Sequence, residues 1–298
     1  MSQKSRLTEK LEGSEFIFTA EYAPAAGTDP SKIEACAGYF RNGITAVNVA
    51  DNHYGVALSS LAASVALSRA GIEPIYQLVT RDRNRIAMQS DLLGAALLGI
   101  KNVLCLSGYH QTLIGSPESA NVFDIDSIQL VAMVNQMNGG QLLDGQDVDG
   151  DFTMLAGAAA NPYLKPLELN MIRLVKKINA GARFIQTQAV FDVAAFKQWL
   201  DAAGKEGLTG KVAFLAGVIP LQSAAQAREL AEKHTDFYIP DAVQSRLQAA
   251  GDAAAQRREG LKIAVEIIRQ IKGLPGLKGI HLLSGGCENS VPKLLAAI

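Results

Sequence analysis

The sequence has little net charge: 28 lysines and arginines nearly balance 29 aspartates and glutamates, which leaves a formal net charge of −1. Proteins that bind a phosphate backbone or an anionic membrane usually present a broad basic field, so we expect no nucleic-acid partner and no membrane partner. The sequence also lacks any run of about 18 or more apolar residues, and its N-terminal segment "MSQKSRLTEKLEG" has no apolar signal core. These absences predict a soluble, cytoplasmic protein with a short polar helix at about residues 4–12.

Cysteine is scarce as well. Cys36, Cys105 and Cys287 lie far apart in the sequence and form no C-x-x-C pair, which favours a reducing compartment and argues against a structural zinc site. The acidic run "LLDGQDVDGDF" (142–152) has aspartates at intervals similar to those of a calcium loop. Its glycines fall at the wrong offsets and no glutamate closes it, so we interpret it as a surface loop. The sequence predicts no metal site.

A glycine-rich phosphate turn of the form G-x-G-x-x-G is also missing, although short apolar runs alternate with segments of helical periodicity throughout the 298 residues. This alternation is typical of βα units around a parallel sheet. The expected strands are 16–21, 46–50, 73–79, 102–107, 152–158, 183–188, 212–218 and 279–284. The expected helices are 30–42, 59–70, 84–98, 125–137, 166–180, 193–203, 223–233, a long extra helix near 252–271 before the last strand, and one from 291.

Local signals at the element ends support this count. Asp29 is placed as the N-cap of the first of these helices, with Pro30 at its first position. Five strands follow a glycine suited to a left-handed helix end, namely Gly43, Gly71, Gly99, Gly181 and Gly279. The repetition predicts a single-domain (β/α)8 TIM barrel over residues 1–298. A doubly wound open sheet is the alternative, but it usually carries the phosphate turn that is missing here.

In such a barrel, binding and catalytic residues lie at the carboxyl ends of the strands. Glu21 closes the first predicted strand, so we expect its carboxyl group in the mouth of the barrel. The other strand ends carry mainly amides and short polar segments: Asn48, Asp51, Gln77, "TRDRNR" (80–85), "SGYH" (107–110), "AAANP" (158–162), "QTQ" (186–188) and "IPLQ" (219–222). Many amides and few carboxylates favour a large neutral heteroaromatic ligand over a metal ion.

Each of these features also has a purely structural explanation. Glu21 could be a helix cap or an ion-pair partner, and "RDRNR" could be a solvated helix start with Asp82 or Asn84 as the cap and exposed arginines. His110 could be a loop histidine rather than a base. Cys287 could be a small half-buried residue beside the last strand rather than a reactive thiol.

Several long segments resemble the methylenetetrahydrofolate reductase family, and they follow the family's order from about residue 14 to the end. They are "FTAEYAP" (18–24), "RDRNRIAMQSDLLGAALLGIKNVLCLSG" (81–108), "INAGARFIQTQAVFD" (178–192) and "GVIPLQSAAQA" (217–227). Within the family, "RDRN" and the ending "GGCENSVP" resemble the branch found in acetogenic and related anaerobic organisms, where partner subunits occur. The resemblance therefore implies a homo-oligomer or a complex with an electron-donor subunit.

The resemblance implies a barrel that holds a flavin, FAD or alternatively FMN. The flavin would take a hydride from NAD(P)H or a protein partner and pass it to 5,10-methylenetetrahydrofolate, which gives 5-methyltetrahydrofolate. The family's glutamate in the motif that matches "FTAEYAP" is the general acid that helps open the imidazolidine ring, and Glu21 takes that role. An apolar strand end beside Phe18 and Tyr22 could keep Glu21 protonated near neutral pH, because desolvation raises the pKa of a carboxyl group.

Further residues of this sequence match functional positions of the family. Gln188 and Gln226 match two glutamines that bind the folate, as an amide can meet both the donors and the acceptors of a pterin edge. The flavin contacts match a larger set, whose cations suit a diphosphate. This set consists of Asn48, Asp51, Gln77, Arg81, Asp82, Arg83, Ser107, Gly108, Tyr109, His110, Asn161 and Lys177.

The sequence also departs from the family's pattern. Tyr109 stands where the family has an aspartate that contacts flavin and folate and stabilises the cationic intermediate, so we place Tyr109 among the catalytic and substrate-binding residues. Cys287 replaces an arginine near the folate tail, Leu230 replaces a phenylalanine that helps stack the nicotinamide, and Ala23 replaces a proline. These departures leave two alternatives open: a pterin-binding barrel that handles a one-carbon group without redox chemistry, and a non-catalytic folate-binding subunit.

Overall fold

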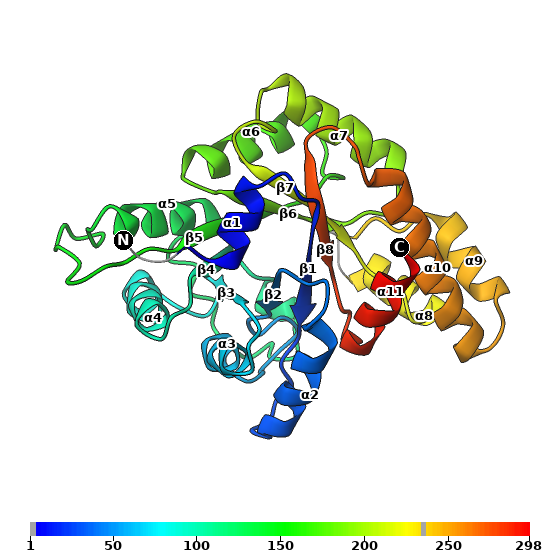
Figure 1. Ribbon diagram of the computed structural model, residues 1–298, viewed down its shortest axis with the longest axis horizontal. Coiled ribbons are helices and arrows are strands. Elements are labelled where there is room, and N and C mark those ends of the chain that lie inside the picture. Colours follow the sequence, from blue (N-terminus) through cyan, green and yellow to red (C-terminus); the bar gives the residue numbers. More distant parts are fainter. Residues whose placement is uncertain (1–3, 234–236) are drawn as a thin grey trace.

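Eight parallel strands close into a barrel in chain order in the computed structural model, which describes residues 4–233 and 237–298 (Figure 1). Each strand pairs with the next, and β8 closes the barrel on β1. The strands are β1 (Ile17–Tyr22), β2 (Ala46–Val49), β3 (Pro74–Val79), β4 (Asn102–Leu106), β5 (Leu155–Ala160), β6 (Phe184–Ala189), β7 (Ala213–Val218) and β8 (Leu277–Leu282). All eight predicted strands are confirmed, and so is the (β/α)8 fold.

The helices surround the barrel, with two short 3₁₀ turns, η1 (Gln111–Leu113) and η2 (Glu288–Ser290). They are α1 (Arg6–Glu12), α2 (Pro30–Phe40), α3 (Ser60–Arg69), α4 (Arg85–Leu97), α5 (Ser127–Asn138), α6 (Leu167–Asn179), α7 (Val193–Lys205), α8 (Ala224–Lys233), α9 (Asp241–Ala249), α10 (Ala253–Ile271) and α11 (Val291–Ala297). The N-terminal helix and the long helix before the last strand are present as predicted. None of the helices within the described residues is long and apolar enough to cross a membrane.

The sequence-based prediction missed α9. All nine residues of this helix are described, and Leu247 is the one among them that is buried, so the segment has almost no apolar periodicity. A second correction concerns Gly279, which lies inside β8 instead of at a helix end. A Cβ at this position would come within 2.3 Å of the carbonyl oxygen of Ile17, so close strand packing requires this glycine.

The other four predicted glycine caps are confirmed. Gly43, Gly71 and Gly99 each have φ of 82° and Gly181 has φ of 117°. Asp29 caps α2 as predicted, accepting a hydrogen bond from the backbone N–H of Ser31. These local signals fix where the helices end and where the strands begin.

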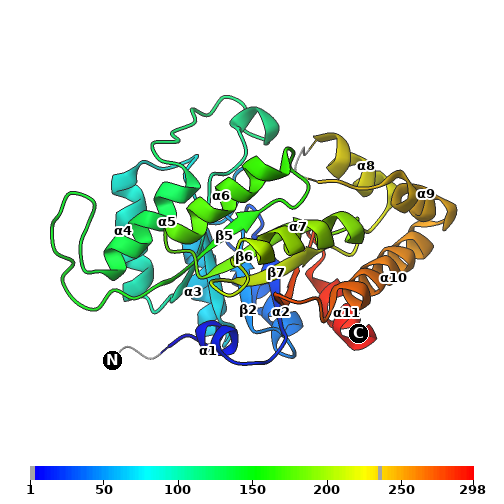
Figure 2. The ribbon, with the colours of Figure 1, turned by 90° about the horizontal axis from the view of Figure 1, so that it is seen from above.

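Helix α1 closes the amino-terminal end of the barrel, which we call the floor. In Figure 2 this helix lies beneath the strands, while the connection between β4 and α5 rises at the opposite end, the mouth. Leu7 is fully buried on an apolar layer that includes Ile17 and Phe184. The Glu73 carboxylate accepts hydrogen bonds of 2.7 Å from the backbone N–H groups of Arg6 and Leu7, and so anchors the first turn of α1.

A polar layer follows above this apolar floor. Asn48 and Gln186 exchange two amide hydrogen bonds across the barrel, at 2.7 and 2.9 Å. Thr19 Oγ1 lies 3.0 Å from His281 Nδ1, which is also 3.3 Å from Gln186 Nε2. Burial lowers the pKa of His281 to about 3, so the imidazole is neutral. The interior therefore changes from apolar at the floor to hydrogen-bonding below the mouth.

Candidate functional site

The mouth contains a cavity of about 810 Å³. A smaller cavity of about 190 Å³ adjoins it, and both are lined by His53 and Gln188. The predicted residues Glu21, Gln188 and Gln226 line the larger cavity together with Leu230. The smaller cavity brings together predicted flavin contacts, namely Asp51, Gln77, Arg81, Ser107, Gly108 and Tyr109. Residues from all parts of the chain thus meet at the carboxyl ends of the strands, as the fold predicts.

Glu21 is a buried carboxyl group on the wall of the larger cavity. It is the second-last residue of β1, with 7% of its surface exposed. Burial, reinforced by the negative charge of Glu288, raises its pKa to about 7, although hydrogen bonds from the Ser284 backbone and the Gln77 side chain act in the opposite direction. A carboxyl group with such a pKa is half protonated near neutral pH and can serve as a proton donor there.

Two amides face the same cavity from other elements. Gln188 lies near the end of β6, and Gln226 lies on the first turn of α8. The Gln226 side chain is held at both ends: its Oε1 accepts from the backbone N–H of Gln222 at 2.8 Å, and its Nε2 donates to the Gly285 carbonyl at 3.4 Å. The two glutamines can therefore offer donors and acceptors to a heteroaromatic ring that enters beside Glu21.

The predicted flavin contacts Asn48 and Asp51 are both engaged within the protein. Asn48 lies one layer below the mouth and pairs with Gln186. The Asp51 carboxylate accepts a 3.0 Å hydrogen bond from the Val79 backbone and forms a 2.7 Å ion pair with Arg83. Arg83 in turn forms a 2.9 Å ion pair with Asp91, so two carboxylates surround this guanidinium.

Arg81 is also engaged, and it is one of the largest fully buried side chains. It donates to both carboxylate oxygens of Asp82 and to the carbonyl oxygens of Asn52 and Tyr109. The guanidinium thus ties together the loops that follow β2, β3 and β4. The alternative in which the arginines of "RDRNR" are exposed is therefore wrong for Arg81. The helix-capping role is confirmed for Asn84, whose side chain accepts hydrogen bonds from the backbone N–H groups of Ile86 and Ala87.

The loop after β4 forms one wall of the smaller cavity. Gly108 has φ of 82°, and a Cβ there would lie 3.2 Å from the Arg81 side chain. The Tyr109 ring lies 5.4 Å from the His53 ring and stacks at 6.4 Å on Tyr54. Sequence reasoning missed the aromatic pair His53 and Tyr54, because the segment that carries them, after β2, has no motif.

Seven predicted site residues do not line either cavity as the described residues define it: Asn48, Asp82 and Arg83, described above, and His110, Asn161, Lys177 and Cys287. His110 is exposed and caps η1 with its own ring, as expected of a loop histidine. Lys177 Nζ donates to the Ala159 carbonyl at 2.6 Å, and the Asn161 side chain accepts from the Tyr163 backbone. Cys287 is half-buried, one residue beyond the lining residue Gly286.

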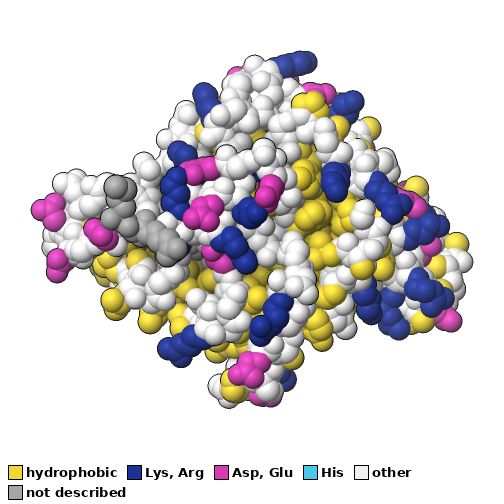
Figure 3. Space-filling model, in the orientation of Figure 1, with side chains coloured by type: hydrophobic (Ala, Val, Ile, Leu, Met, Phe, Trp, Pro, Cys, Tyr) yellow, Lys and Arg dark blue, Asp and Glu magenta, His cyan; other side chains and the backbone are white. Residues whose placement is uncertain are grey.

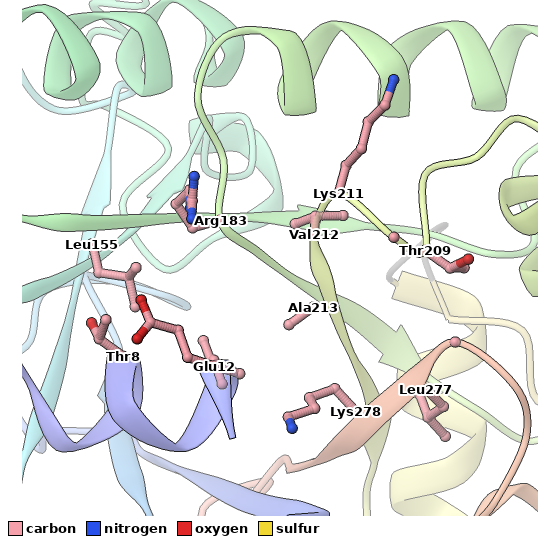
Figure 4. A pocket seen from close by; sticks show the side chains of 13 residues that line it. Thr8, Glu12, Leu155, Arg183, Thr209, Lys211, Val212, Ala213, Leu277 and Lys278 are labelled. Carbon is pink, nitrogen blue, oxygen red and sulfur yellow. The ribbon is translucent and has the colours of Figure 1, made fainter. Parts of the chain in front are cut away.

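A third cavity, of about 370 Å³, lies at the floor beside α1. Its walls include Glu12, Arg183, Lys211 and Lys278. Figure 4 shows that Lys211 points away from α1, and Figure 3 shows acidic and basic side chains spread over this face. The charged side chains around the floor cavity are mostly exposed to solvent. The floor cavity differs in this respect from the mouth cavity, which is lined by a buried acid and by amides. The described residues hold no cluster of potential metal ligands at either end.

The fold and the mouth cavity define a (β/α)8-barrel protein with a buried acid and amides at the ends of its strands. Within this class, the chain belongs to the methylenetetrahydrofolate reductase family, because the family model described as methylenetetrahydrofolate reductase matches residues 6–298.

Individual relatives are distant. The chain is 23% identical to 5,10-methylenetetrahydrofolate reductase from Salmonella typhimurium over 214 residues, which are 72% of this chain and 66% of that protein. It is 25% identical to the Escherichia coli protein of the same name over 184 residues, 61% of this chain and 55% of that protein. The chain thus spans less than two thirds of the length of these relatives.

One solved structure resembles the whole barrel. It belongs to an uncharacterized protein from Clostridium thermocellum that binds two copies of 5-methyl-5,6,7,8-tetrahydrofolic acid. The two chains superpose with a TM-score of 0.69 at 15% sequence identity, covering 98% of this chain and 97% of the other. At this identity the similarity supports the fold.

Proposed function

We propose that this protein interconverts 5,10-methylenetetrahydrofolate and 5-methyltetrahydrofolate as an oxidoreductase of one-carbon metabolism. The observation that carries the proposal is a buried carboxyl group with a pKa of about 7 on a cavity that Gln188 and Gln226 also line. A pterin edge presents donors and acceptors side by side, which two amides can match. The cavity volume of about 810 Å³ falls within the range of small-molecule sites.

The protein's own part in the reaction centres on Glu21. In the proposed mechanism, its carboxyl proton passes to N10 of the folate as the bond between N10 and the bridging carbon breaks. The bridging carbon then forms an iminium with N5 and can accept a hydride. Gln188 and Gln226 hold the pterin, while the apolar wall formed by Ile219 and Leu283 excludes water from the reacting carbon.

A hydride carrier is required for this reaction, and we propose a flavin. The smaller cavity suits the edge of a flavin ring, since Gln77, Ser107 and Gln188 supply amide and hydroxyl groups. A bound flavin would supply the hydride. The proposed diphosphate cations fit less well, because Arg81 and Arg83 are already paired with Asp82 and with Asp51 and Asp91.

These ion pairs, together with the neutral Tyr109, favour a second candidate function: a folate-binding barrel that handles a one-carbon group without redox chemistry. The absorbance spectrum of the purified protein separates the two functions. A flavin spectrum with turnover of 5-methyltetrahydrofolate in the presence of an artificial electron acceptor supports the reductase. Colourless protein that still binds 5-methyltetrahydrofolate, and does not oxidise it when FAD or FMN is added, supports the second function.

The same assay addresses the electron donor, which we propose to be NAD(P)H or a protein partner. Reduced protein prepared with NADH, with NADPH or with a low-potential chemical reductant is mixed with methylenetetrahydrofolate, and the methyl product is quantified. Product with a nicotinamide supports direct use of that donor. Product with the chemical reductant alone supports a protein donor.

A further inference from the structure

A second carboxyl group lies beside Glu21. Glu288 begins η2, which follows β8 after the connecting residues 283–287, and β8 is the neighbour of β1 in the barrel. The Glu288 side chain turns toward β1, since its Oε1 accepts a hydrogen bond of 3.2 Å from the backbone N–H of Ala23. It also accepts one of 3.4 Å from the Ser284 hydroxyl group. Glu288 is thus held against Ala23, a residue that lines the larger cavity and lies two positions after Glu21 in the chain.

Ser284 connects the two carboxyl groups. Its backbone N–H donates to Glu21, while its hydroxyl donates to Glu288. Ser284 is itself 1% exposed, whereas Glu288 is partly exposed. A negative charge near a buried carboxyl group disfavours ionisation of that group.

Among the described residues that line the mouth cavity, no lysine or arginine could offset a second negative charge near Glu21. Glu229 and Glu232 line the same cavity. Around Glu288, the pKa of Tyr22 is raised to about 12 and that of Cys36 to about 11, mainly by burial and in part by the Glu288 charge. Below the two carboxyl groups His281 is neutral, and the Arg257 charge on α10 acts on Cys287, whose pKa it lowers against the effects of burial and of Glu288.

We propose that Glu288 is a positioning residue for Glu21: its carboxylate, held against β1 by the hydrogen bonds from Ala23 and Ser284, places a negative charge near Glu21 that keeps the proton on Glu21 at neutral pH. This inference rests on the proposed function for its catalytic meaning. When Glu21 gives its proton to N10, both carboxylates are charged beside the folate iminium. Glu288 then supplies, from the β8 side, the negative charge that the neutral Tyr109 does not provide.

The test is the titration of Glu21 in substrate-free protein. Glutamate side chains are labelled with ¹³C at the carboxyl carbon, and the Glu21 signal is assigned by its absence in Glu21→Gln. In Glu288→Gln the amide oxygen can still accept the hydrogen bonds from Ala23 and Ser284, while the charge is lost. We expect the pKa of Glu21 to fall by about one unit or more, because a like charge has been removed.

Glu34→Gln is the matched control, since Glu34 is exposed on α2 and its substitution likewise removes one carboxylate, but from a side chain that makes no hydrogen bond with Ala23 or Ser284 within the described residues. It should leave the Glu21 titration unchanged. An unaltered Glu21 pKa in Glu288→Gln, or an equal fall in Glu34→Gln, contradicts the proposal. If Glu288→Gln does not fold, the wild-type spectra decide: the Glu21 signal should titrate well above the ordinary value of 4.5, and titration at that ordinary value contradicts the proposal.

Activity provides an independent readout. In wild-type protein, folate reduction should decline as pH rises through the pKa of Glu21, and in Glu288→Gln this decline should occur at lower pH with the rate at low pH largely retained. A variant that loses rate equally at every pH contradicts the positioning role. Wild-type protein without activity, but with the expected shift of the Glu21 pKa, would refute the proposed function and leave the carboxyl pair intact.

Discussion

The mouth and the floor of the barrel each contain a cavity, yet their chemistry differs. The floor cavity is lined by exposed groups such as Arg183 and Lys211, above which Leu7 seals an apolar layer. The mouth cavity is lined by a buried acid and by amides that the fold holds in place. A cavity therefore becomes a candidate site through the burial and fixed orientation of its polar groups, and neither volume nor charge alone is sufficient.

The charged groups at the floor and at the mouth show the same difference in burial. At the floor, Glu12 pairs with Lys4 at 2.7 Å, but both side chains are at least half exposed, and such surface pairs contribute only about 0–1 kcal/mol. At the mouth, desolvation alone is the largest cause of the raised pKa of Glu21. Substitution of Glu21 at the mouth should accordingly affect both the chemistry and the pH dependence of stability, whereas substitutions at the floor should leave the chemistry unchanged.

The largest expected effect is the loss of catalysis in Glu21→Gln. Removal of the proton donor should reduce the rate of methylenetetrahydrofolate reduction by about two to four powers of ten, the usual contribution of a general acid. Rapid mixing of reduced protein with substrate measures this step directly. Glu12→Gln at the floor is the control and should react at the wild-type rate; a Glu21→Gln rate near that of wild type removes Glu21 from its assigned role.

Next in size is the loss of stability in Leu7→Ala. Because Leu7 is fully buried between α1 and the floor, we expect the free energy of unfolding to fall by about 2–5 kcal/mol. Urea denaturation followed by circular dichroism measures the change. Leu97→Ala, on an α4 side chain that is 87% exposed, should cost about 0.5 kcal/mol or less. If Leu7→Ala also weakens folate binding, then the two ends are not independent.

A smaller effect concerns stability and pH. The folded-state pKa of Glu21 is about 7 against an ordinary value of 4.5, so its contribution to stability is fully present below pH 4.5 and is lost as pH rises through 7. The stability difference between wild type and Glu21→Gln should shift by roughly 2–3 kcal/mol in favour of the variant between pH 5 and pH 8. Burial of neutral His281 opposes this trend in both proteins and cancels in the difference.

Thermal unfolding at several pH values provides this comparison. The floor variant Glu12→Gln should follow the wild-type curve throughout the range. Parallel curves for wild type and Glu21→Gln would mean that Glu21 has the same pKa in the folded and unfolded states, and the mouth would then be more solvated than its burial indicates.

The sequence predicts much of the fold because its signals are local. Asp29 and Pro30 specify the start of α2 within three residues, and Gly43, Gly71 and Gly99 end helices by backbone preference alone. The missed features depend on contacts between distant segments. Gly279 is required by a carbonyl group on β1, and the burial of Arg81 depends on carbonyl groups of two other loops.

The residues of the candidate site show the same contrast between local sequence signals and contacts between distant segments. Glu21, Gln188 and Gln226 could be placed at the mouth because strand ends and family motifs mark them, and the structure brings all three to one cavity. Glu288 lies within the ending "GGCENSVP", but that motif gave no sign of a relation to Glu21. The relation arises through the contacts of Glu288 with Ala23 and Ser284 once the barrel closes. Asn161 and Lys177 match family positions, yet their side chains bond to backbone groups of the β5 region instead of facing the cavities.

The most direct test of the central claim is an equilibrium titration of 5-methyltetrahydrofolate into wild-type protein, Gln188→Ala and the floor variant Lys211→Ala. Binding at the mouth predicts that Gln188→Ala loses about 1–3 kcal/mol of affinity, because a pterin group loses its hydrogen-bond partner, while Lys211→Ala binds as wild type does. Equal affinity of Gln188→Ala and wild type, or weakened binding in Lys211→Ala, would show that the mouth cavity is not the folate site.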